Sequence, residues 1–290
     1  MKRTIILIFC MVAMTSLTAS AQGSKVATDS VKSAVLGTYV KYNVYTPAGY
    51  DSRVSKPYPV IYLLHGLYGC NEDWEKRGGM KAIADELINS GEMREAVVIM
   101  PNAGHEDIHN VYNGYFNMPD WNYEDFFFTE FIQEVEAKYR CGGSKGLRAV
   151  MGLSMGGGGS TVYAQHHPEV FSSCYAMSAW LDCDDFSDED DADAPHDKFY
   201  YTCKTVSENA AIDFVKNASP ETIQALRSVK WFFDCGDDDS LMPLSVDLHL
   251  AMSAARIKNE LRVRDGVHSW EYWHTALRLA FPFASRNFEK

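Results

Sequence analysis

Basic residues are scarce in this sequence. Lys and Arg number 27 against 39 Asp and Glu, and the formal net charge at pH 7 is −12. Nucleic acids and anionic lipid surfaces are negative themselves, so they repel such a chain unless it carries a basic patch. The sequence contains no basic patch. The composition therefore excludes nucleic acid and membrane surfaces as expected partners.

Long apolar runs are missing after residue 21, and the sequence contains no internal repeat. A membrane-spanning helix needs about 20 predominantly apolar residues, so none is expected in that part of the chain. Hydrophobic residues nevertheless make up 46% of the sequence. This content is ordinary for a globular protein and sufficient for one large core or two small ones.

The first 21 residues have the features of a secretory signal peptide. Lys2 and Arg3 form a basic start, residues 5–17 are apolar, and residues 19–21 (ASA) have the small-residue form of a cleavage site. A short membrane anchor is the alternative interpretation. We therefore expect an exported protein, periplasmic or extracellular, with a polar, loose lead-in at residues 22–34.

Removal of a signal peptide takes away Cys10 and leaves six of the seven cysteines. Export permits disulfides, but the sequence does not determine which cysteines pair. We predict Cys183 with Cys203, because this pair brackets an acidic segment, and buried free thiols are the alternative. The segment is expected to be a solvated insertion or lid edge over about 182–206. Since it lacks an EF-hand type of loop, calcium binding is only an alternative and no metal site is predicted.

Segments typical of strands alternate with segments typical of helices. The expected strands lie within 39–47, 59–66, 95–101, 147–152, 171–179, 229–236 and 260–266. The expected helices lie within 80–91, 123–140, 156–167, 243–257 and from about 270 onward. This alternation predicts a mainly parallel sheet with helices on both faces.

Ser154 stands in the pattern G-x-S-x-G, formed by Gly152 to Gly156, between an expected strand and an expected helix. In that context the pattern is typical of a sharp turn that exposes a nucleophilic serine. Side chains at the flanking positions would clash, which explains the glycines. The N-terminus of the following helix favours negative charge beside the serine. We therefore predict that Ser154 is a nucleophile.

A nucleophilic serine needs a base and an acid, and in this fold class they follow in the order serine, acid, histidine. His268 is the histidine expected in the loop between the last strand and the last helix, and we predict that it is the base. The acid should follow the preceding strand, where Asp237, Asp238 and Asp239 stand together. Spacing alone does not choose among the three.

An oxyanion hole needs backbone N–H groups directed at the developing negative charge. Met155, directly after the nucleophile, is predicted to supply one of them. The second should follow the strand that ends in LLHGLYG, where Leu67 is the predicted donor and Tyr68 the alternative. His65 ends that buried strand and is expected to be structural.

These motifs together resemble the esterase D group of α/β-hydrolases, which includes feruloyl, acetylxylan and tributyrin esterases, S-formylglutathione hydrolases and mycolyltransferases. The matching stretches span most of residues 40–280 and are YPVIYLLHGLYG, VVIMPN, YEDFF, VMGLSMGGGGS, DCGDDDSL and HSWEYW. The resemblance implies an α/β-hydrolase catalytic domain over residues 35–290 that needs no cofactor. The group's G-x-x-D pattern implies Asp239 as the acid, its H-x-W pattern implies His268 with Trp270, and it places an oxyanion donor at Leu67.

The expected reaction is hydrolysis of carboxylic esters through an acyl-enzyme, and the resemblance implies feruloyl or acetyl esters of plant polysaccharide as substrates. A thioesterase like S-formylglutathione hydrolase and a generic short-chain esterase are the alternatives. Aromatic rings stack on sugar rings and phenolic groups. The residues expected to contact substrate on this ground are Tyr68, Trp74, Tyr115, Trp180 and Trp270. Packing in the core is the alternative for each, and the oligomeric state stays open.

Two other classes of function deserve comparison with the serine esterase. HEDIH (105–109) fits the zinc motif H-E-x-x-H, which requires a helix that turns both histidines to one face. No apolar period supports a helix there, so we expect a polar loop and no zinc hydrolase. An inactive binding module is the other class, and the presence of Ser154, Asp239 and His268 argues against it.

Overall fold

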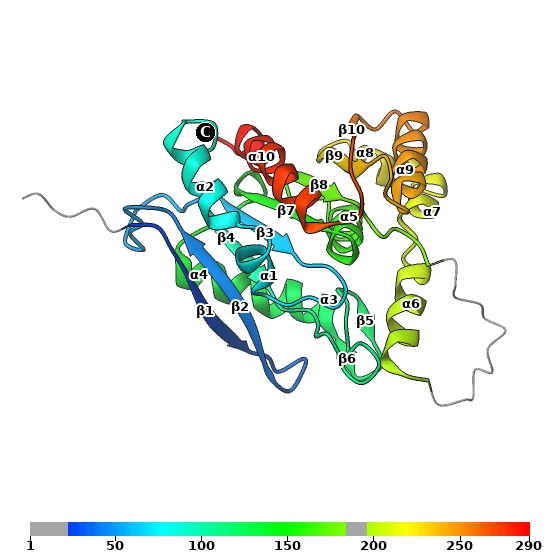
Figure 1. Ribbon diagram of the computed structural model, residues 1–290, viewed down its shortest axis with the longest axis horizontal. Coiled ribbons are helices and arrows are strands. Elements are labelled where there is room, and N and C mark those ends of the chain that lie inside the picture. The colour runs from blue at the N-terminus through cyan, green and yellow to red at the C-terminus, as the bar shows by residue number, and fades with distance from the viewer. Residues whose placement is uncertain (1–22, 184–195) are drawn as a thin grey trace, which may run out of the picture.

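The computed structural model describes residues 23–183 and 196–290. Eight strands form one sheet in the order β1-β2-β4-β3-β7-β8-β9-β10, shown in Figure 1. Their bounds are Lys25–Lys32 (β1), Tyr39–Thr46 (β2), Val60–Leu64 (β3), Val97–Pro101 (β4), Arg148–Leu153 (β7), Ser173–Met177 (β8), Lys230–Gly236 (β9) and Asn259–Arg264 (β10). A separate short hairpin consists of Asn117–Met118 (β5) and Trp121–Asn122 (β6).

The helices connect the strands and cover both faces of the sheet. Their bounds are Asp73–Lys76 (α1), Met80–Asn89 (α2), Tyr123–Phe126 (α3), Ile132–Tyr139 (α4), Met155–His166 (α5), Lys198–Glu208 (α6), Ala211–Lys216 (α7), Pro220–Leu226 (α8), Met242–Ala254 (α9) and Trp270–Asn287 (α10). A π-helical turn, Phe127–Phe131, joins α3 to α4, and a 3-10 turn, Lys145–Leu147, precedes β7.

Alternating side chains of the buried strands serve two separate cores, as the two-residue period of a strand requires. In β3, Val60, Tyr62 and Leu64 pack with residues of α3–α5 and α9. Ile61 and Leu63 point to the other face and pack with residues of α2 and α10. A strand buried on both faces therefore reads as a continuous apolar run in the sequence.

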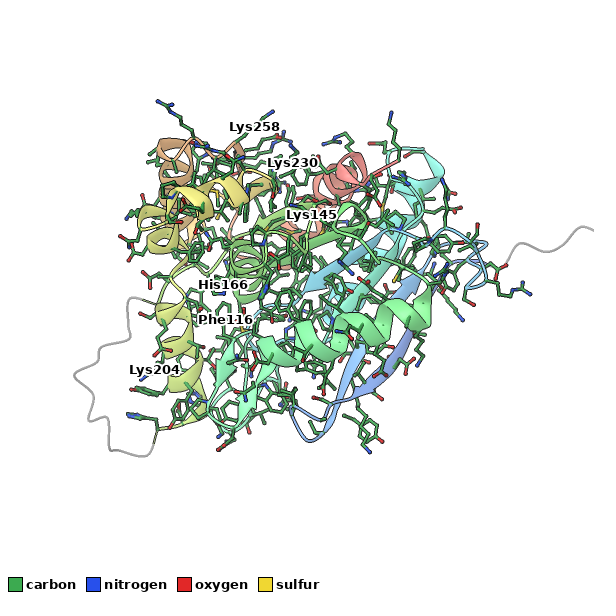
Figure 2. The ribbon with its side chains drawn as sticks, turned by 180° about the vertical axis from the view of Figure 1, so that it is seen from behind. Phe116, Lys145, His166, Lys204, Lys230 and Lys258 are labelled. Carbon is green, nitrogen blue, oxygen red and sulfur yellow. The ribbon has the colours of Figure 1, made fainter. Side chains whose placement is uncertain are left out.

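The sheet is mainly parallel, as predicted. Strands β4, β3, β7, β8, β9 and β10 run parallel to one another, whereas β2 pairs antiparallel with both β1 and β4. The carboxyl ends of the parallel strands therefore meet along one edge. The amino ends of β7, β9 and β10 lie at the opposite edge, close to Lys145, Lys230 and Lys258, which Figure 2 shows near one another.

The expectation of a loose lead-in is wrong for residues 25–32, and that of a solvated insertion or lid edge is wrong only in part. Residues 25–32 of the expected loose lead-in form β1, because their backbone pairs over its whole length with β2. In the segment expected as a solvated insertion or lid edge, residues 198–206 belong to helix α6, which buries Thr202, Cys203 and Val206, so this part is not fully solvated. The lid edge stays a prediction. Asp197 caps this helix by accepting a hydrogen bond from the N–H of Tyr200.

Other expectations fall partly or wholly outside the described residues. The signal peptide at 1–21 lies outside them, and so do residues 184–195 of the acidic segment, where calcium binding was the alternative. Cys183 and Cys203 are both buried in the same core, and their pairing stays a prediction. Within the described ranges, no helix has the length and apolar character needed to cross a membrane.

Candidate active site

Ser154 occupies the turn between β7 and α5, and its backbone angles are φ 54° and ψ −119°. A non-glycine residue in this region costs about 1–3 kcal/mol, so its surroundings must hold it there. The N–H of Ser154 donates to the carbonyl of Met177 at 2.9 Å, and its carbonyl accepts from the N–H of Trp180 at 3.0 Å. The last residue of β8 and the segment after it therefore fix the turn and leave the serine at the N-terminus of α5.

The glycines around Ser154 are required by close backbone approach. A Cβ atom on Gly152 would lie 2.4 Å from the carbonyl oxygen of Gly156, and one on Gly156 would lie 2.5 Å from that of His65. The start of α5 thus packs directly against β7 and the end of β3. This confirms the steric explanation of the G-x-S-x-G pattern.

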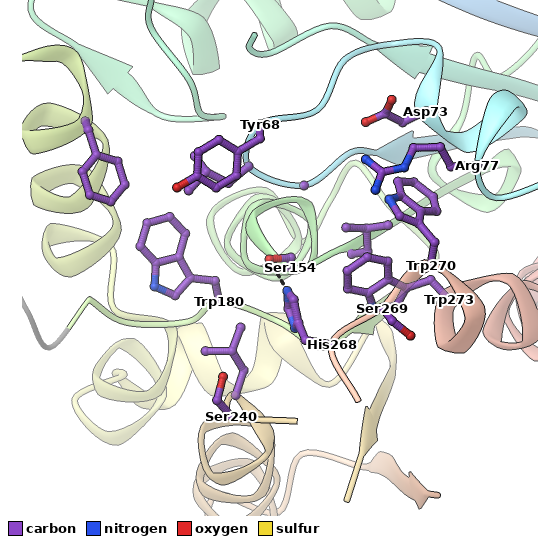
Figure 3. A pocket seen from close by; sticks show the side chains of 15 residues that line it. Tyr68, Asp73, Arg77, Ser154, Trp180, Ser240, His268, Ser269, Trp270 and Trp273 are labelled. Atoms are coloured by element: carbon purple, nitrogen blue, oxygen red, sulfur yellow. Dashed lines mark hydrogen bonds between the residues drawn. The ribbon is translucent and has the colours of Figure 1, made fainter. Parts of the chain in front are cut away.

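Three side chains from three loops meet at the carboxyl edge of the sheet. The Oγ atom of Ser154 lies 3.0 Å from Nε2 of His268. The other ring nitrogen of His268, Nδ1, lies 2.9 Å from Oδ2 and 3.1 Å from Oδ1 of Asp239. The structure therefore brings together the residues predicted as nucleophile, base and acid, and Figure 3 shows the serine and the histidine facing one another.

Asp239 differs from its two acidic neighbours in burial. Asp239 is buried, whereas Asp237 and Asp238 are exposed. Burial opposes ionisation of the Asp239 carboxyl, but hydrogen bonds from His268 and from the N–H of Leu241 act against it and hold its pKa below the ordinary value. The group that faces His268 is therefore a carboxylate. Asp237 instead accepts from the N–H of Gly266 at 3.0 Å, in the loop that carries His268.

His65 holds the loop that contains Leu67. Its Nε2 accepts a hydrogen bond from the N–H of Ala103 at 2.9 Å, and its Nδ1 lies 2.8 Å from the carbonyl of Gly66. Burial lowers the pKa of His65, so the ring is neutral and donates from Nδ1. The ring therefore joins the ends of β3 and β4. Among the described residues, no hydrogen bond occupies the N–H of Leu67 or that of Met155.

A cavity of about 720 Å³ opens above Ser154. Tyr68 and Trp180 line it on one side, and Phe199 also belongs to its lining. Trp270 and Arg77 line it on the other side, where the Arg77 guanidinium lies 5.0 Å above the Trp270 ring, and Figure 3 shows the labelled side chains of both sides. The arrangement places a candidate nucleophile on the floor of a pocket that several aromatic side chains line.

Comparisons with known proteins agree with this geometry. The family model described as "Putative esterase" matches residues 33–284. The chain belongs to this esterase family. A solved ferulic acid esterase shares 43% sequence identity with it at a TM-score of 0.86, with 92% of this chain and 100% of that chain covered.

More distant relatives are also similar to this esterase-family chain. An endo-1,4-beta-xylanase/feruloyl esterase of Xylanibacter ruminicola is 27% identical over 241 residues, which are 81% of this chain and 28% of the relative. The chain thus spans less than a third of the length of this curated relative. An S-formylglutathione hydrolase of Staphylococcus aureus has 21% identity and a TM-score of 0.67, covers 91% of this chain and 100% of its own, and shows the shared fold. The α/β-hydrolase fold is therefore confirmed.

Two of the five residues expected to contact substrate lie in the core instead. Trp74 is fully buried and donates its indole N–H to the carbonyl of Leu64 at 2.9 Å. Tyr115 is also buried, and its hydroxyl donates to the carbonyl of His65 at 3.0 Å. The prediction for these two residues is wrong, because their polar atoms are satisfied by backbone behind the site. Substrate contact by Tyr68, Trp180 and Trp270, which do line the cavity, stays a prediction.

HEDIH forms a loop rather than a helix, as expected. Nδ1 of His109 lies 2.7 Å from the carboxylate of Asp197, and Nδ1 of His105 accepts from the N–H of Asp107. Over the described ranges, no group of three or more His, Cys, Asp or Glu side chains is arranged to hold a metal ion. The loop instead anchors the start of α6.

Sequence reasoning missed several residues of the cavity, among them Phe199, Arg77 and Trp273. Phe199 comes from α6, which the acidic composition of the preceding residues concealed. The ring of Trp273 packs perpendicular to the His268 ring at 4.8 Å between centroids. Its signal was available, because Trp273 follows Trp270 by three residues on a helix and so lies on the same face.

Proposed function

We propose that this protein is an exported serine esterase that hydrolyses carboxylic esters through an acyl-enzyme. The proposal rests on the chain of hydrogen bonds that runs from Asp239 through His268 to Ser154 on the floor of an open cavity. Membership of an esterase family supports it. The activity requires no cofactor.

In the first half of the reaction, Ser154 Oγ attacks the ester carbonyl carbon while Nε2 of His268 takes the hydroxyl proton. The carbonyl oxygen becomes an oxyanion, and the N–H groups of Leu67 and Met155 are available to stabilise it. The carbon–oxygen bond to the alcohol then breaks, and His268 returns its proton to the leaving alcohol oxygen. The acyl group stays on Ser154.

Water completes the reaction by the same route. His268 accepts a proton from a water molecule as its oxygen attacks the acyl carbon, and it returns that proton to Ser154 Oγ when the acyl–serine bond breaks. Asp239 holds the imidazole in the tautomer that carries hydrogen on Nδ1 and stabilises the transient imidazolium. Its depressed pKa suits this role, because the carboxylate stays ionised throughout.

Feruloyl or acetyl esters of plant polysaccharide are the substrate class that we propose. The aromatic side chains that line the cavity, among them Tyr68, Trp180 and Phe199, suit a phenolic acyl group. The 43% identical ferulic acid esterase supports the feruloyl part of this substrate class. A thioesterase acting on S-formylglutathione is the alternative, since an enzyme with that activity shares the fold.

A rate panel on purified protein tests the proposed function. It compares methyl ferulate, acetylated xylan, p-nitrophenyl acetate and butyrate, and S-formylglutathione, and it includes the Ser154→Ala variant. We expect Ser154→Ala to lower turnover by a factor of up to about 10⁶ and to abolish labelling by a fluorophosphonate. A variant that keeps a tenth of wild-type turnover would refute the serine mechanism. A preference for the thioester by about two orders of magnitude in kcat/KM, or about 2.7 kcal/mol, would refute only the polysaccharide substrate.

A further inference from the structure

Asp234, on β9, is a fully buried carboxylate that lies outside the cavity. Nε and Nη2 of Arg264 donate to its two oxygens at 3.2 and 3.1 Å. The hydroxyl of Tyr175 donates to Oδ2 at 2.5 Å, and the hydroxyl of Tyr272 donates to Oδ1. A buried charge of this kind is tolerated when it is paired and hydrogen-bonded, and here both conditions are met.

The donors keep their protons in this environment. Burial and the neighbouring carboxylate raise the pKa of Tyr272, and they raise that of Tyr175 as well. Arg264 stays charged, and its guanidinium also lies 4.1 Å above the Tyr272 ring. Its third nitrogen, Nη1, donates to the hydroxyl of Thr275 on α10 at 2.9 Å. Asp234 therefore joins three strands and a helix through donors that do not titrate near neutral pH.

The positions of these donors in the chain relate the network to the site. Arg264 is the last residue of β10 and stands four residues before His268, and Tyr272 stands four residues after it in the first turn of α10. Both ends of the loop 265–269 are thus tied to one carboxylate. That carboxylate itself stands five residues before Asp239 on the strand that leads to the acid.

Backbone contacts carry the constraint from the network to the two loops. The N–H of Asp237 donates to the carbonyl of Arg264 at 2.9 Å, and the N–H of Asp238 donates to that of Gly266 at 3.1 Å. A Cβ atom on Gly236 would lie 2.2 Å from the Gly266 oxygen, so the loops touch without space for a side chain. A displacement of β10 relative to β9 would therefore change the distance between His268 and Asp239.

We propose that Asp234 is a positioning residue, which sets the place of His268 relative to Asp239 and Ser154 by holding both ends of the loop 265–269 through Arg264 and Tyr272. This inference rests on the proposed role of His268 as the base. Tyr175, which bonds the same carboxylate from β8, does not belong to the loop and contributes to stability alone. Both tyrosines thus donate a phenol hydroxyl to Asp234, but only Tyr272 is expected to influence the position of His268.

The experiment compares Tyr272→Phe with Tyr175→Phe, since each removes one phenol hydroxyl from Asp234 and keeps the ring. We expect Tyr272→Phe to lower kcat for p-nitrophenyl acetate and the rate of fluorophosphonate labelling by about 10-fold, with KM unchanged, because a misplacement of about 1 Å costs up to about 10² in rate. Tyr175→Phe should keep the wild-type kcat. The two variants should lower the melting temperature by similar amounts. Asp234→Asn should exceed both in loss of kcat, but this variant carries the greater risk of misfolding.

Hydrogen exchange provides a readout that does not depend on activity. Backbone amides of residues 265–269 should exchange faster in Tyr272→Phe than in Tyr175→Phe. Equal exchange in this loop, or equal kcat and labelling rates in the two variants, would overturn the positioning role and leave Asp234 a stabilising residue. Failure of the proposed function would appear differently, as wild-type turnover that survives Ser154→Ala.

Discussion

The floor and the walls of the cavity are built in different ways. The floor consists of Ser154, Asp239 and His268, which stand in the turns and loops after the parallel strands β7, β9 and β10. The walls consist of side chains from distant segments, such as Tyr68 after β3, Phe199 on α6 and Trp270 on α10. Short sequence motifs therefore identify the residues of the floor, whereas tertiary packing decides which residues form the walls. Substitutions in the floor should lower the rate for every ester, and substitutions in the walls should change the preference among esters.

After Ser154→Ala, the largest expected loss of activity is that of a change at the acid, Asp239. Asp239→Asn should lower kcat by about 10⁴, because the amide favours the wrong imidazole tautomer. Asp237→Asn and Asp238→Asn should cost far less, since both residues are exposed and an amide oxygen at 237 still accepts from the N–H of Gly266. Steady-state kinetics on p-nitrophenyl acetate measures all three. Equal losses would mean that the acid has been assigned to the wrong residue.

A wall residue should have a smaller and more selective effect. Trp180→Ala should lower kcat/KM for methyl ferulate by about 3- to 10-fold relative to p-nitrophenyl acetate, because it removes one aromatic contact. Trp74→Phe is the matched control, since Trp74 is buried behind the site and bonds Leu64. It should lower the melting temperature and leave the ratio of the two substrates unchanged. A change of the ratio in Trp74→Phe but not in Trp180→Ala would reverse our assignment of wall and core.

The depressed pKa of Asp239 predicts a pH dependence of stability. A carboxyl whose pKa is lower in the folded state stabilises the protein above the pKa of the unfolded residue, about 3.9, and loses this contribution as the pH falls through the folded value. The free energies of unfolding of the wild type and Asp239→Asn should therefore differ at pH 7 and converge below about pH 4. Urea unfolding at several pH values measures the difference. A gap that widens on acidification would contradict the sign.

The smallest expected effect is that of chelation. EDTA should leave the rate unchanged, since His105 and His109 make contacts within their own loop and with Asp197 rather than facing one site. His105→Ala should likewise keep the wild-type kcat. If EDTA abolished activity and zinc restored it, His105 and His109 would be metal ligands after all.

The sequence predicted most of the fold because most of its strands are buried on both faces. The apolar runs of β3, β4 and β7 are unambiguous signals for this reason. Strand β1 was missed because an edge strand with mostly exposed or half-exposed residues has no clear apolar period. Its structure comes from pairing with β2, which local sequence does not report.

The site was predictable to different depths for physical reasons. Ser154 and His268 follow from a local turn motif and from the order of the elements along the chain. Asp239 could not be chosen from the residues alone, because three adjacent carboxyls have the same chemistry and differ only in burial, and the resemblance supplied the choice. Trp74 and Tyr115 were misjudged because an aromatic residue near a strand end packs equally well into a core or into a pocket, and only the tertiary structure distinguishes the two.

The position of β10 at the edge of the sheet has a consequence for how the protein fails under stress. The serine follows β7 in the middle of the sheet, whereas the histidine follows β10. Among the described residues β10 pairs with β9 alone, and it carries mostly exposed or half-exposed side chains. Edge segments open locally at lower free-energy cost than the centre of a domain. Gentle heating or dilute denaturant should therefore separate His268 from Ser154 while the central strands remain folded. Activity, in this protein, would be lost at a lower denaturant concentration than secondary structure.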